Sequence, residues 1–172
     1  TRGEAVTILS KALEVNGWDM NKTTQNVKTN KTNPLPIPTA LPKGVIGYLT
    51  VQGTNIKEFP VKDAKDNEEM LTVMKSAVGH FTQTPIFNGN VGVSAHNRDY
   101  KIDFRQLKNV NVGDMVTYRT NLGTRTYKIA TKTEIEETDF FYLENTTDNR
   151  VTMITCIEEK PTKRLVVQAI QI

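Results

Sequence analysis

The sequence predicts an all-β fold, a barrel or a sandwich with small helical insertions, which follows an N-terminal helical segment. From Val45 onward, short apolar stretches alternate with turn residues, a pattern typical of all-β sandwiches and barrels. The seven candidate strands are GVIGYLTV, NIKEFPV, NVGVSAH, DMVTYRT, RTYKIATK, RVTMITCI and RLVVQAI. The chain has 172 residues, no internal repeat and no glycine-rich phosphate loop, so one domain with its own core is expected.

Residues 1–43 are predicted to form a helical appendage and a linker. Within residues 4–16 the apolar side chains recur at the spacing of one helical face, and they are Ala5, Ile8, Leu9, Ala12 and Leu13. Gly17 would end this helix. The next stretch, NKTTQNVKTNKTNPLPIPTALPKG, has prolines that favour an extended path. The sequence therefore divides into an appendage at 1–43 and a β domain at 44–172.

Two short helical insertions interrupt the predicted strands. Asp66 or Asn67 would cap a helix over residues 68–78, because short polar side chains accept hydrogen bonds from the first helical N–H groups. Its apolar face would carry Met70, Leu71, Met74 and Val78. A single turn is expected over residues 104–107, and TNLGTR is expected to form a hairpin turn between two strands.

Composition argues against two classes of partner or location. The net charge is +3, and the Lys and Arg residues are scattered without aromatic residues among them, so nucleic-acid binding has little support. No apolar run approaches the length that spans a bilayer, and the N-terminal TRGEAVTILSKALEV carries charges where a secretory signal would be apolar. We expect either a soluble protein or one whose anchor lies outside this sequence.

Cys156 is the only cysteine in the chain. A single cysteine excludes an intramolecular disulfide and a multi-thiolate metal site, which leaves packing, an intermolecular bond or a reactive thiol. It ends an apolar strand, and the polar stretch EEKPTKR begins soon after it, which indicates a strand end near a loop. Packing is the commoner role of a free cysteine, and a nucleophilic thiol needs a base or a cation beside it.

His96 and Arg164 are candidates to activate this thiol. His96 ends the strand GNVGVSAH, where a rigid strand can hold a catalytic side chain near solvent. His80, the only other histidine, follows the predicted helix end, and a structural role is favoured for it. Arg164 lies on the strand after Cys156, where its guanidinium suits a carbonyl or a developing oxyanion. Taken singly, each of these residues is more commonly structural or solvated.

Four separated motifs resemble those of sortases, the transpeptidases of Gram-positive cell surfaces. TMITC, with an arginine on the following strand, resembles their Thr-Leu-x-Thr-Cys signature, and GNVGVSAHN resembles their strand that ends in Ala-Gly-His. FRQLKNVNVGDMVTY is similar to their Phe-x-x-Leu-x-x-x-x-x-Gly-Asp segment, and GYLTV to their opening strand. The matches follow the family order over residues 44–172, with conservative departures at Met153, Ser94 and Ala95.

The resemblance implies a closed eight-stranded sortase β-barrel and assigns three roles. Cys156 would be the nucleophile, His96 the general acid and base, and Arg164 the stabilising cation. The implied reaction is acyl transfer: the thiol attacks the Thr–Gly bond of a Leu-Pro-x-Thr-Gly-like sorting signal, and an amine of a peptidoglycan precursor or a pilin lysine releases the thioacyl enzyme. No cofactor is implied. The implied location is the outer face of the bacterial cytoplasmic membrane, through an anchor outside this sequence.

The resemblance also implies a substrate groove beside the thiol. Thr155 and Thr152 are candidates to provide donors near the oxyanion, and packing within the strand explains them at least as well. The segment TKTEIEETDFFYLENTTDNR, residues 131–150, would wall the groove. Its FFYL run would either contact the Leu and Pro of the signal or lie in the core under the loop, and the candidates are Phe140, Phe141 and Leu143.

The same segment is acidic, and some sortases bind calcium in this region. Its acidic residues are Glu134, Glu136, Glu137 and Asp139. Calcium needs six or more converging oxygens, and an acidic surface run is usually solvated. We therefore predict no metal site.

The N-terminal segment bears on the sortase subclass. Some pilin-building sortases carry a lid with an Asp-Pro-aromatic anchor, and here only GWDM, with Trp18 before Asp19 and no proline, is similar. A homologous lid is therefore not expected. NPLPIPTALPKG imitates a sorting signal that could occupy the groove, although a plain tether is the simpler interpretation. The short loop before TMITC favours a class D-like enzyme over class B.

Two other functions fit the same residues. A β-barrel binding module of the cell surface could carry all three without catalysis. A hydrolytic cysteine peptidase could use the same Cys–His pair and pass the acyl group to water. Substitution of Cys156 and the effect of an added amine separate these functions from transpeptidation.

Overall fold

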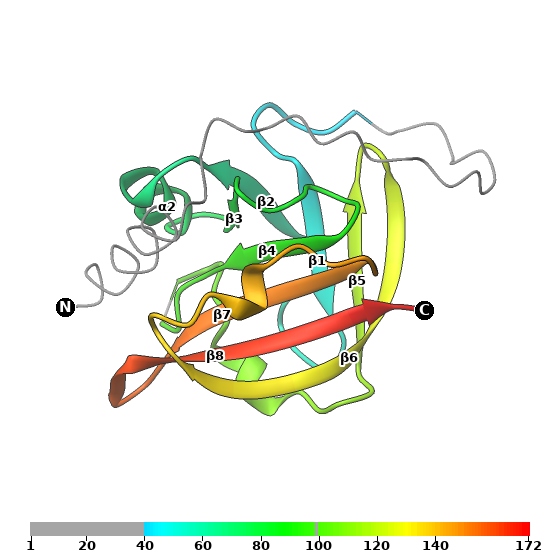
Figure 1. Cartoon of the computed structure of the whole chain (residues 1–172). Helices are drawn as coiled ribbons and strands as arrows, with labels where there is room; N and C mark the ends of the chain where they lie inside the picture. Colours follow the sequence, from blue (N-terminus) through cyan, green and yellow to red (C-terminus); the bar gives the residue numbers. More distant parts are fainter. Residues whose placement is uncertain (1–39, 99) are drawn as a thin grey trace.

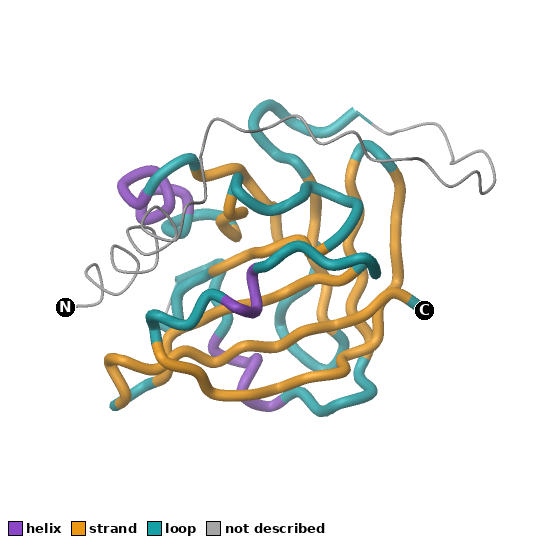
Figure 2. The backbone as a smooth tube through the Cα atoms, viewed as in Figure 1, coloured by secondary structure: helices purple, strands orange, loops and turns teal. Residues whose placement is uncertain are grey.

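Figure 1 shows the protein as a computed structural model. The structure describes residues 40–98 and 100–172. They form a closed barrel with the strand order β1-β2-β3-β4-β7-β8-β6-β5, and Figure 2 shows the helical segments on the outside of the strands. The predicted all-β barrel with short helices is therefore confirmed. The helix predicted at 4–16, the linker after it, and Trp18 and Asp19 lie outside the described residues, so the division after residue 43 stays a prediction.

The barrel has eight strands, one more than the apolar stretches in the sequence indicated. They are β1 (Gly47–Val51), β2 (Phe59–Ala64), β3 (Val78–Phe81), β4 (Asn90–Ser94), β5 (Met115–Thr120), β6 (Gly123–Glu136), β7 (Arg150–Ile157) and β8 (Lys160–Gln171). The helical segments are α2 (Asn67–Val73) and two 3-10 turns, η1 (Arg105–Asn109) and η2 (Phe141–Leu143). The strand pairs β2–β3 and β4–β7 are parallel.

The additional strand, β3, lies where the sequence predicted the end of a helix. α2 ends at Val73, and residues 78–81 pair with β2 and β4 instead. The predicted helix to residue 78 and the position of His80 after a helix end are therefore wrong. The barrel closes only with a strand between β2 and β4, and Gly79 allows that strand to lie against α2, because a Cβ at Gly79 would collide with Met70.

Three local predictions are confirmed. Asp66 caps α2, since its side chain accepts a hydrogen bond from the Glu69 backbone N–H at 2.9 Å. The turn predicted at 104–107 overlaps η1. TNLGTR joins β5 to β6 as a tight hairpin, in which Gly123 takes a φ of 139°, a backbone conformation that favours glycine.

His80 is fully buried in the centre of β3 and is held by polar groups. Its Nδ1 lies 2.8 Å from a carboxylate oxygen of Asp63 on β2. Its Nε2 lies 3.1 Å from the Pro85 carbonyl and 3.1 Å from the Thr84 hydroxyl. These contacts join β2, β3 and the β3–β4 connection, which fits the structural role expected for this histidine.

Two hydrophobic clusters lie on opposite faces of the sheet. The larger one fills the barrel and receives Val151 and Met153 from β7. The second lies on the outer face and brings together residues of β7, α2 and the β6–β7 connection, among them Ile154, Met70 and Leu143. Because successive strand residues face opposite sides, Cys156 shares the outer face with Ile154. The candidate nucleophile therefore lies on the outside of the barrel wall.

β6 is longer than the sequence indicated. It continues through Glu136, so the connection to β7, which we call the β6–β7 loop, comprises residues 137–149 rather than 131–150. Within the described ranges, no helix combines the length and the apolar character needed to cross a membrane.

Candidate functional site

The parallel pairing of β4 and β7 brings His96 and Cys156 to one edge of the barrel. Ser94 and Ile154 are partners in this parallel ladder. His96 and Cys156 each come two residues after one of these partners, so both side chains arrive at the same edge. The Asn97 side chain reinforces the junction by donating a 2.9 Å hydrogen bond to the Cys156 carbonyl.

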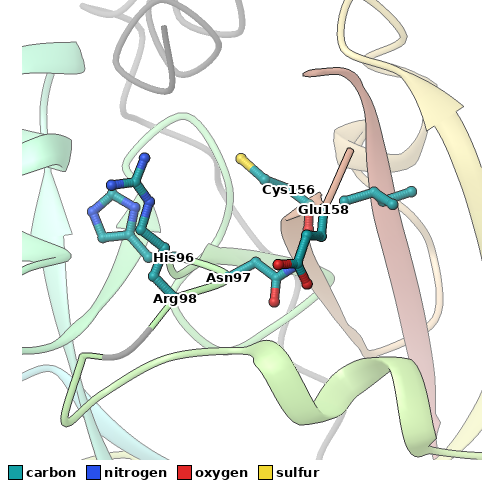
Figure 3. A pocket seen from close by; sticks show the side chains of 6 residues that line it. His96, Asn97, Arg98, Cys156 and Glu158 are labelled. Atoms are coloured by element: carbon teal, nitrogen blue, oxygen red, sulfur yellow. The ribbon is translucent and has the colours of Figure 1, made fainter. Parts of the chain in front are cut away.

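A small pocket contains both candidate catalytic residues. It is lined by His96, Asn97, Arg98, Cys156, Ile157 and Glu158. Figure 3 shows the Cys156 sulfur pointing from the β7 side towards the side of the pocket that carries His96 and Arg98. Cys156 is a free, half-buried thiol, so reagents and substrates in solvent can reach it through this pocket.

The imidazole of His96 is positioned by an aromatic neighbour. It stacks on the Tyr100 ring with a centroid separation of 4.8 Å and an interplanar angle of 24°. His96 itself is half-buried, and it lies just beyond β4 rather than within it. A stacked ring restricts the orientation of the imidazole and leaves its edges for polar partners. This arrangement suits a group that exchanges protons with a substrate.

Arg164 lies opposite Cys156, but its guanidinium is bonded to groups outside the pocket. The two residues are partners in the antiparallel β7–β8 ladder, so their side chains share a face. The guanidinium nevertheless hydrogen-bonds to Glu137 at 2.6 Å, beyond β6, which borders β8 on the side away from β7. Arg164 is almost completely buried and is not among the residues that line the pocket. The arginine in that lining is Arg98.

The two predicted threonines are buried and bonded within the barrel wall. Thr155 donates to the Ala95 carbonyl at 2.8 Å, which fastens the end of β4 to β7 beside the pocket. Thr152 donates to the Asn90 side-chain oxygen at 2.6 Å, and it lies four residues before Cys156, about 13 Å away along the strand. Neither threonine lines the pocket.

The predicted groove residues of the β6–β7 loop divide into buried and exposed ones. Phe140 and Leu143 belong to the outer hydrophobic cluster. Leu143 packs directly on β4, because a Cβ at Gly92 would clash with its side chain. Phe141 is 68% exposed, and its ring lies edge-on to that of Tyr142 at 5.5 Å. Phe141 is therefore the residue of the run whose side chain is open to a ligand.

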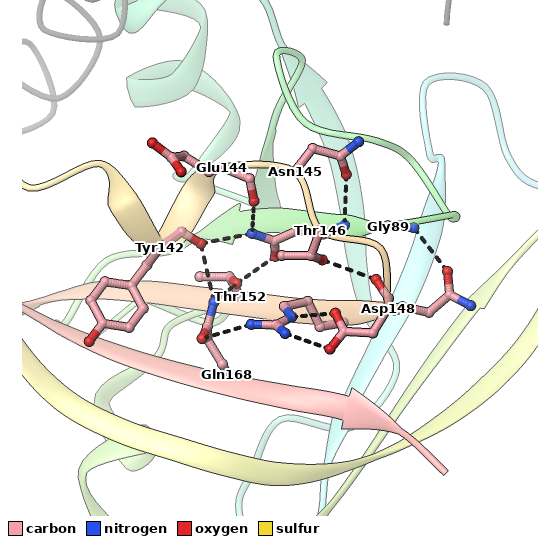
Figure 4. Close-up of polar contacts among 11 residues, drawn as sticks. Gly89, Tyr142, Glu144, Asn145, Thr146, Asp148, Thr152 and Gln168 are labelled. Atoms are coloured by element: carbon pink, nitrogen blue, oxygen red, sulfur yellow. Dashed lines mark hydrogen bonds and ion pairs between the residues drawn. The ribbon is translucent and has the colours of Figure 1, made fainter. Parts of the chain in front are cut away.

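A buried polar network holds the same loop against the barrel. The Asn90 amide donates to the Tyr142 and Glu144 carbonyls at 2.8 Å each. Its oxygen accepts from Thr152, whose hydroxyl in turn accepts from Gln168 at 2.9 Å. Figure 4 shows these contacts crossing from the loop to β4, β7 and β8. The loop is therefore tied to three strands by Thr152 and by two side chains that sequence analysis had not singled out, Asn90 and Gln168.

A second set of bonds secures the end of the loop. Arg150 donates to both carboxylate oxygens of Asp148, at 2.7 and 2.5 Å. This hydrogen-bonded guanidinium lowers the pKa of the Asp148 carboxyl. Arg150 also contacts Gln168 at 3.4 Å, so this arginine belongs to the loop anchor, and it is not among the residues that line the pocket.

The acidic residues of β6 and of the loop are paired with protein groups. Glu134 pairs with Lys160, Glu136 with Lys163 and Glu137 with Arg164. Asp139 accepts a hydrogen bond from the Phe141 backbone N–H at 3.1 Å. Among residues 40–98 and 100–172, no three His, Cys, Asp or Glu side chains are grouped so that they could hold a metal ion.

Comparison with solved structures places the fold among sortases. Sortase C1 from Streptococcus suis is 25% identical with a TM-score of 0.65, over 74% of this chain and 73% of that one. The pilus-related sortase C of Group B Streptococcus is 18% identical with a TM-score of 0.67, over 99% and 89%. Sortase A from Corynebacterium diphtheriae is 18% identical with a TM-score of 0.64, and the 74% of this chain that matches spans 60% of that protein.

Comparison of the sequence with family profiles gives the same result over most of the β domain. No curated protein matches the chain. The profile of the sortase domain, however, matches residues 49–172, which run from β1 through β8 and include the whole candidate site. Because this match covers well over half of the sequence, the chain belongs to the sortase family of cysteine transpeptidases.

Proposed function

We propose that this protein cleaves a Leu-Pro-x-Thr-Gly-like sorting signal and transfers the acyl portion to an amine. Cys156 is the nucleophile, His96 the general acid and base, and Arg164 the cation that stabilises the oxyanion. The observation that carries the proposal is the parallel β4–β7 pairing, which delivers the chain's lone thiol and an imidazole to one solvent-accessible pocket. A thiol beside an imidazole is the arrangement that nucleophilic acyl transfer requires.

The first half-reaction forms a thioester. The Cys156 thiolate attacks the carbonyl carbon of the Thr–Gly bond, and the negative charge moves to the carbonyl oxygen. When the C–N bond breaks, the His96 imidazolium donates its proton to the leaving Gly nitrogen. The carbon–sulfur bond remains, so the enzyme holds the Thr acyl group as a thioester and the Gly-containing peptide leaves.

The second half-reaction transfers the acyl group. An amine attacks the thioester carbon, His96 accepts the proton that the amine loses, and the C–S bond breaks to restore the Cys156 thiolate and the His96 imidazolium with which the cycle began. The acceptor is an amine of a peptidoglycan precursor or a pilin lysine. One of the similar structures is described as pilus-related, so a pilin lysine is one of the two acceptors to be tested. The site of action is the outer face of the bacterial membrane, reached through an anchor outside these residues.

The test uses the whole chain and a fluorogenic Leu-Pro-x-Thr-Gly peptide library, with and without an amine acceptor. We expect cleavage, a new amide product when the amine is present, and an acyl adduct on Cys156 detectable by mass spectrometry of the intact protein. Cleavage that is indifferent to the amine would favour a hydrolytic peptidase. Absence of cleavage and of adduct across the library would favour a non-catalytic binding module and overturn the proposal.

Substitution of Arg164 is expected to lower turnover strongly. Arg164→Ala removes the cation paired with Cys156 across the ladder, and loss of one oxyanion donor typically costs on the order of 100-fold in kcat. It also leaves Glu137 without its cation, so we expect a lower melting temperature with the fold retained. Steady-state kinetics and thermal unfolding measure the two effects. Wild-type kinetics would instead move the role to another arginine, such as Arg98 or Arg150, of which only Arg98 lines the pocket.

A further inference from the structure

β8 bulges beside the candidate nucleophile. In the β7–β8 ladder, Arg164 pairs with Cys156, but the next residue of β7, Ile157, pairs with Lys160. Residues 161–163 of β8 therefore have no partners on β7. Bulges next to active sites commonly redirect a side chain. Here the redirected side chain is that of Arg164, which is the first residue of β8 after the bulge.

The bulge and the end of β6 together enclose the guanidinium of Arg164. Its Nη1 donates to the Pro161 carbonyl at 2.8 Å and to the Lys163 carbonyl at 2.6 Å. Its Nη2 donates to a carboxylate oxygen of Glu137 at 2.6 Å. These three bonds use at most three of the five N–H groups of an arginine, so at least two donors remain for a substrate oxygen.

Glu137 is held as firmly as the arginine it contacts. It is the first residue after β6, and its backbone N–H donates to the Thr162 carbonyl in the bulge at 2.8 Å. Because its own backbone is bonded to the bulge, its carboxylate has a defined position relative to Arg164. The backbone of Glu137 is thus bonded to the bulge, and its side chain is bonded to Arg164, the residue that follows the bulge.

This ion pair differs from its two neighbours in burial. The side chains of Arg164 and Glu137 are 4% and 14% exposed. Those of the pairs Lys160–Glu134 and Lys163–Glu136 are all between 39% and 55% exposed. Exposed pairs contribute little and exchange freely with solvent, whereas a buried, charge-assisted bond fixes geometry. Of these three ion pairs, therefore, only Arg164–Glu137 is buried enough to hold its side chains in one position.

We propose that Glu137 is a positioning residue that acts through Arg164. Its carboxylate and the two bulge carbonyls fix the guanidinium plane just outside the pocket of the free protein, so that the remaining N–H groups approach the oxyanion from one defined position once the substrate is bound. The proposal rests on the proposed function, because it presupposes that Arg164 serves acyl transfer. It adds a residue from the β6–β7 loop to a site otherwise built from the ends of β4, β7 and β8.

The test compares Glu137→Gln with Glu136→Gln as a matched control. Both variants remove one charge by an isosteric change, at adjacent positions that pair with β8. We expect Glu137→Gln to lower kcat roughly tenfold while KM changes less than about twofold, because misplacement of a transition-state group affects turnover more than binding. Glu136→Gln is expected to keep wild-type kinetics.

A double-mutant cycle shows whether the effect passes through Arg164. In an Arg164→Ala background, Glu137→Gln is expected to cause no further loss of kcat, because the group that it positions is absent. An equal loss in both backgrounds would assign Glu137 a role independent of Arg164 and overturn the proposal. Unchanged or faster turnover of the single variant would also overturn it.

A spectroscopic measurement keeps the proposal falsifiable apart from activity. The Nε–H signal of Arg164, identified in 15N-labelled protein by its loss in Arg164→Lys, is expected to shift and to exchange faster in Glu137→Gln but not in Glu136→Gln. A signal unaffected by Glu137→Gln would show that the carboxylate does not hold the guanidinium. A wild-type protein that cleaves no sorting peptide would remove the proposed function and this inference together. Normal wild-type cleavage with an unaffected Glu137→Gln would remove the inference alone.

Discussion

Cys156→Ala is expected to abolish both cleavage and acyl transfer. The thiol is the only one in the chain, and the described pocket offers no other side chain of comparable nucleophilicity. Without it the thioacyl intermediate cannot form, so the reaction loses its covalent route entirely. The measurement is peptide cleavage followed by chromatography, with mass spectrometry to confirm that no adduct accumulates on the variant.

The control for this variant is its stability. Cys156 is half-buried, and replacement by alanine removes a single sulfur atom, so thermal unfolding should stay within a few degrees of the wild type. Full cleavage by Cys156→Ala would remove the enzyme proposal.

His96→Gln, which keeps a polar side chain beside Tyr100, is expected to lose turnover by at least 100-fold with thiol alkylation still possible.

Local patterns in the sequence predicted most of the barrel, and failed where a strand lacked a local signal of its own. Apolar stretches bounded by turn residues identified seven strands. β3 was missed because Val78 continues the helical spacing of Met70 and Met74, whereas its four residues become a strand only by pairing with β2 and β4. Such pairing is a property of the closed barrel, and the eight strands could be anticipated only through the family resemblance.

The same distinction holds for the candidate site. Cys156 and His96 each come at the end of a recognisable strand, so their residue types and positions were visible in the sequence. The contact of Arg164 with Glu137 spans 27 positions and depends on the β8 bulge, which no pattern of residues in the sequence predicts. The acidic stretch from Glu134 to Asp139 looked like a solvated run, and only the register of β6 against β8 shows that one of its carboxylates is buried.

Residue chemistry alone also could not separate the members of the FFYL run. Phe140 and Phe141 are identical in type and adjacent in sequence, yet the first is buried in the outer cluster and the second is exposed. Phe140 is the N-cap residue before η2 and Phe141 is the first residue of η2, so the two side chains leave the backbone at the start of a turn and face different surroundings. A contact between Phe141 and the sorting signal remains a proposal that its exposure supports.

Asn90→Ala is expected to cause the largest loss of stability among single substitutions around the site. Asn90 is fully buried, and its side chain satisfies two loop carbonyls and one hydroxyl at once. Removing it leaves these polar groups buried without their hydrogen-bond partner, and each buried unsatisfied group costs about 1–3 kcal/mol. We expect the free energy of unfolding to fall by about 3 kcal/mol, measured by urea denaturation.

The same substitution should loosen the β6–β7 loop before it affects the barrel. The loop carbonyls of Tyr142 and Glu144 flank the end of η2 and depend on the Asn90 amide, so hydrogen exchange should accelerate there first.

Asn90→Asp is an informative comparison, because it keeps the acceptor for Thr152 but turns an anionic oxygen towards two carbonyls, and it should destabilise the protein at least as much as Asn90→Ala. Asn55→Ala, at an exposed position, is the matched control and should change stability by less than about 0.5 kcal/mol. If Asn90→Ala were as mild as this control, the loop would be held by the hydrophobic contacts of Leu143 and not by the polar network. In that event the position of the β6–β7 loop would depend on packing alone.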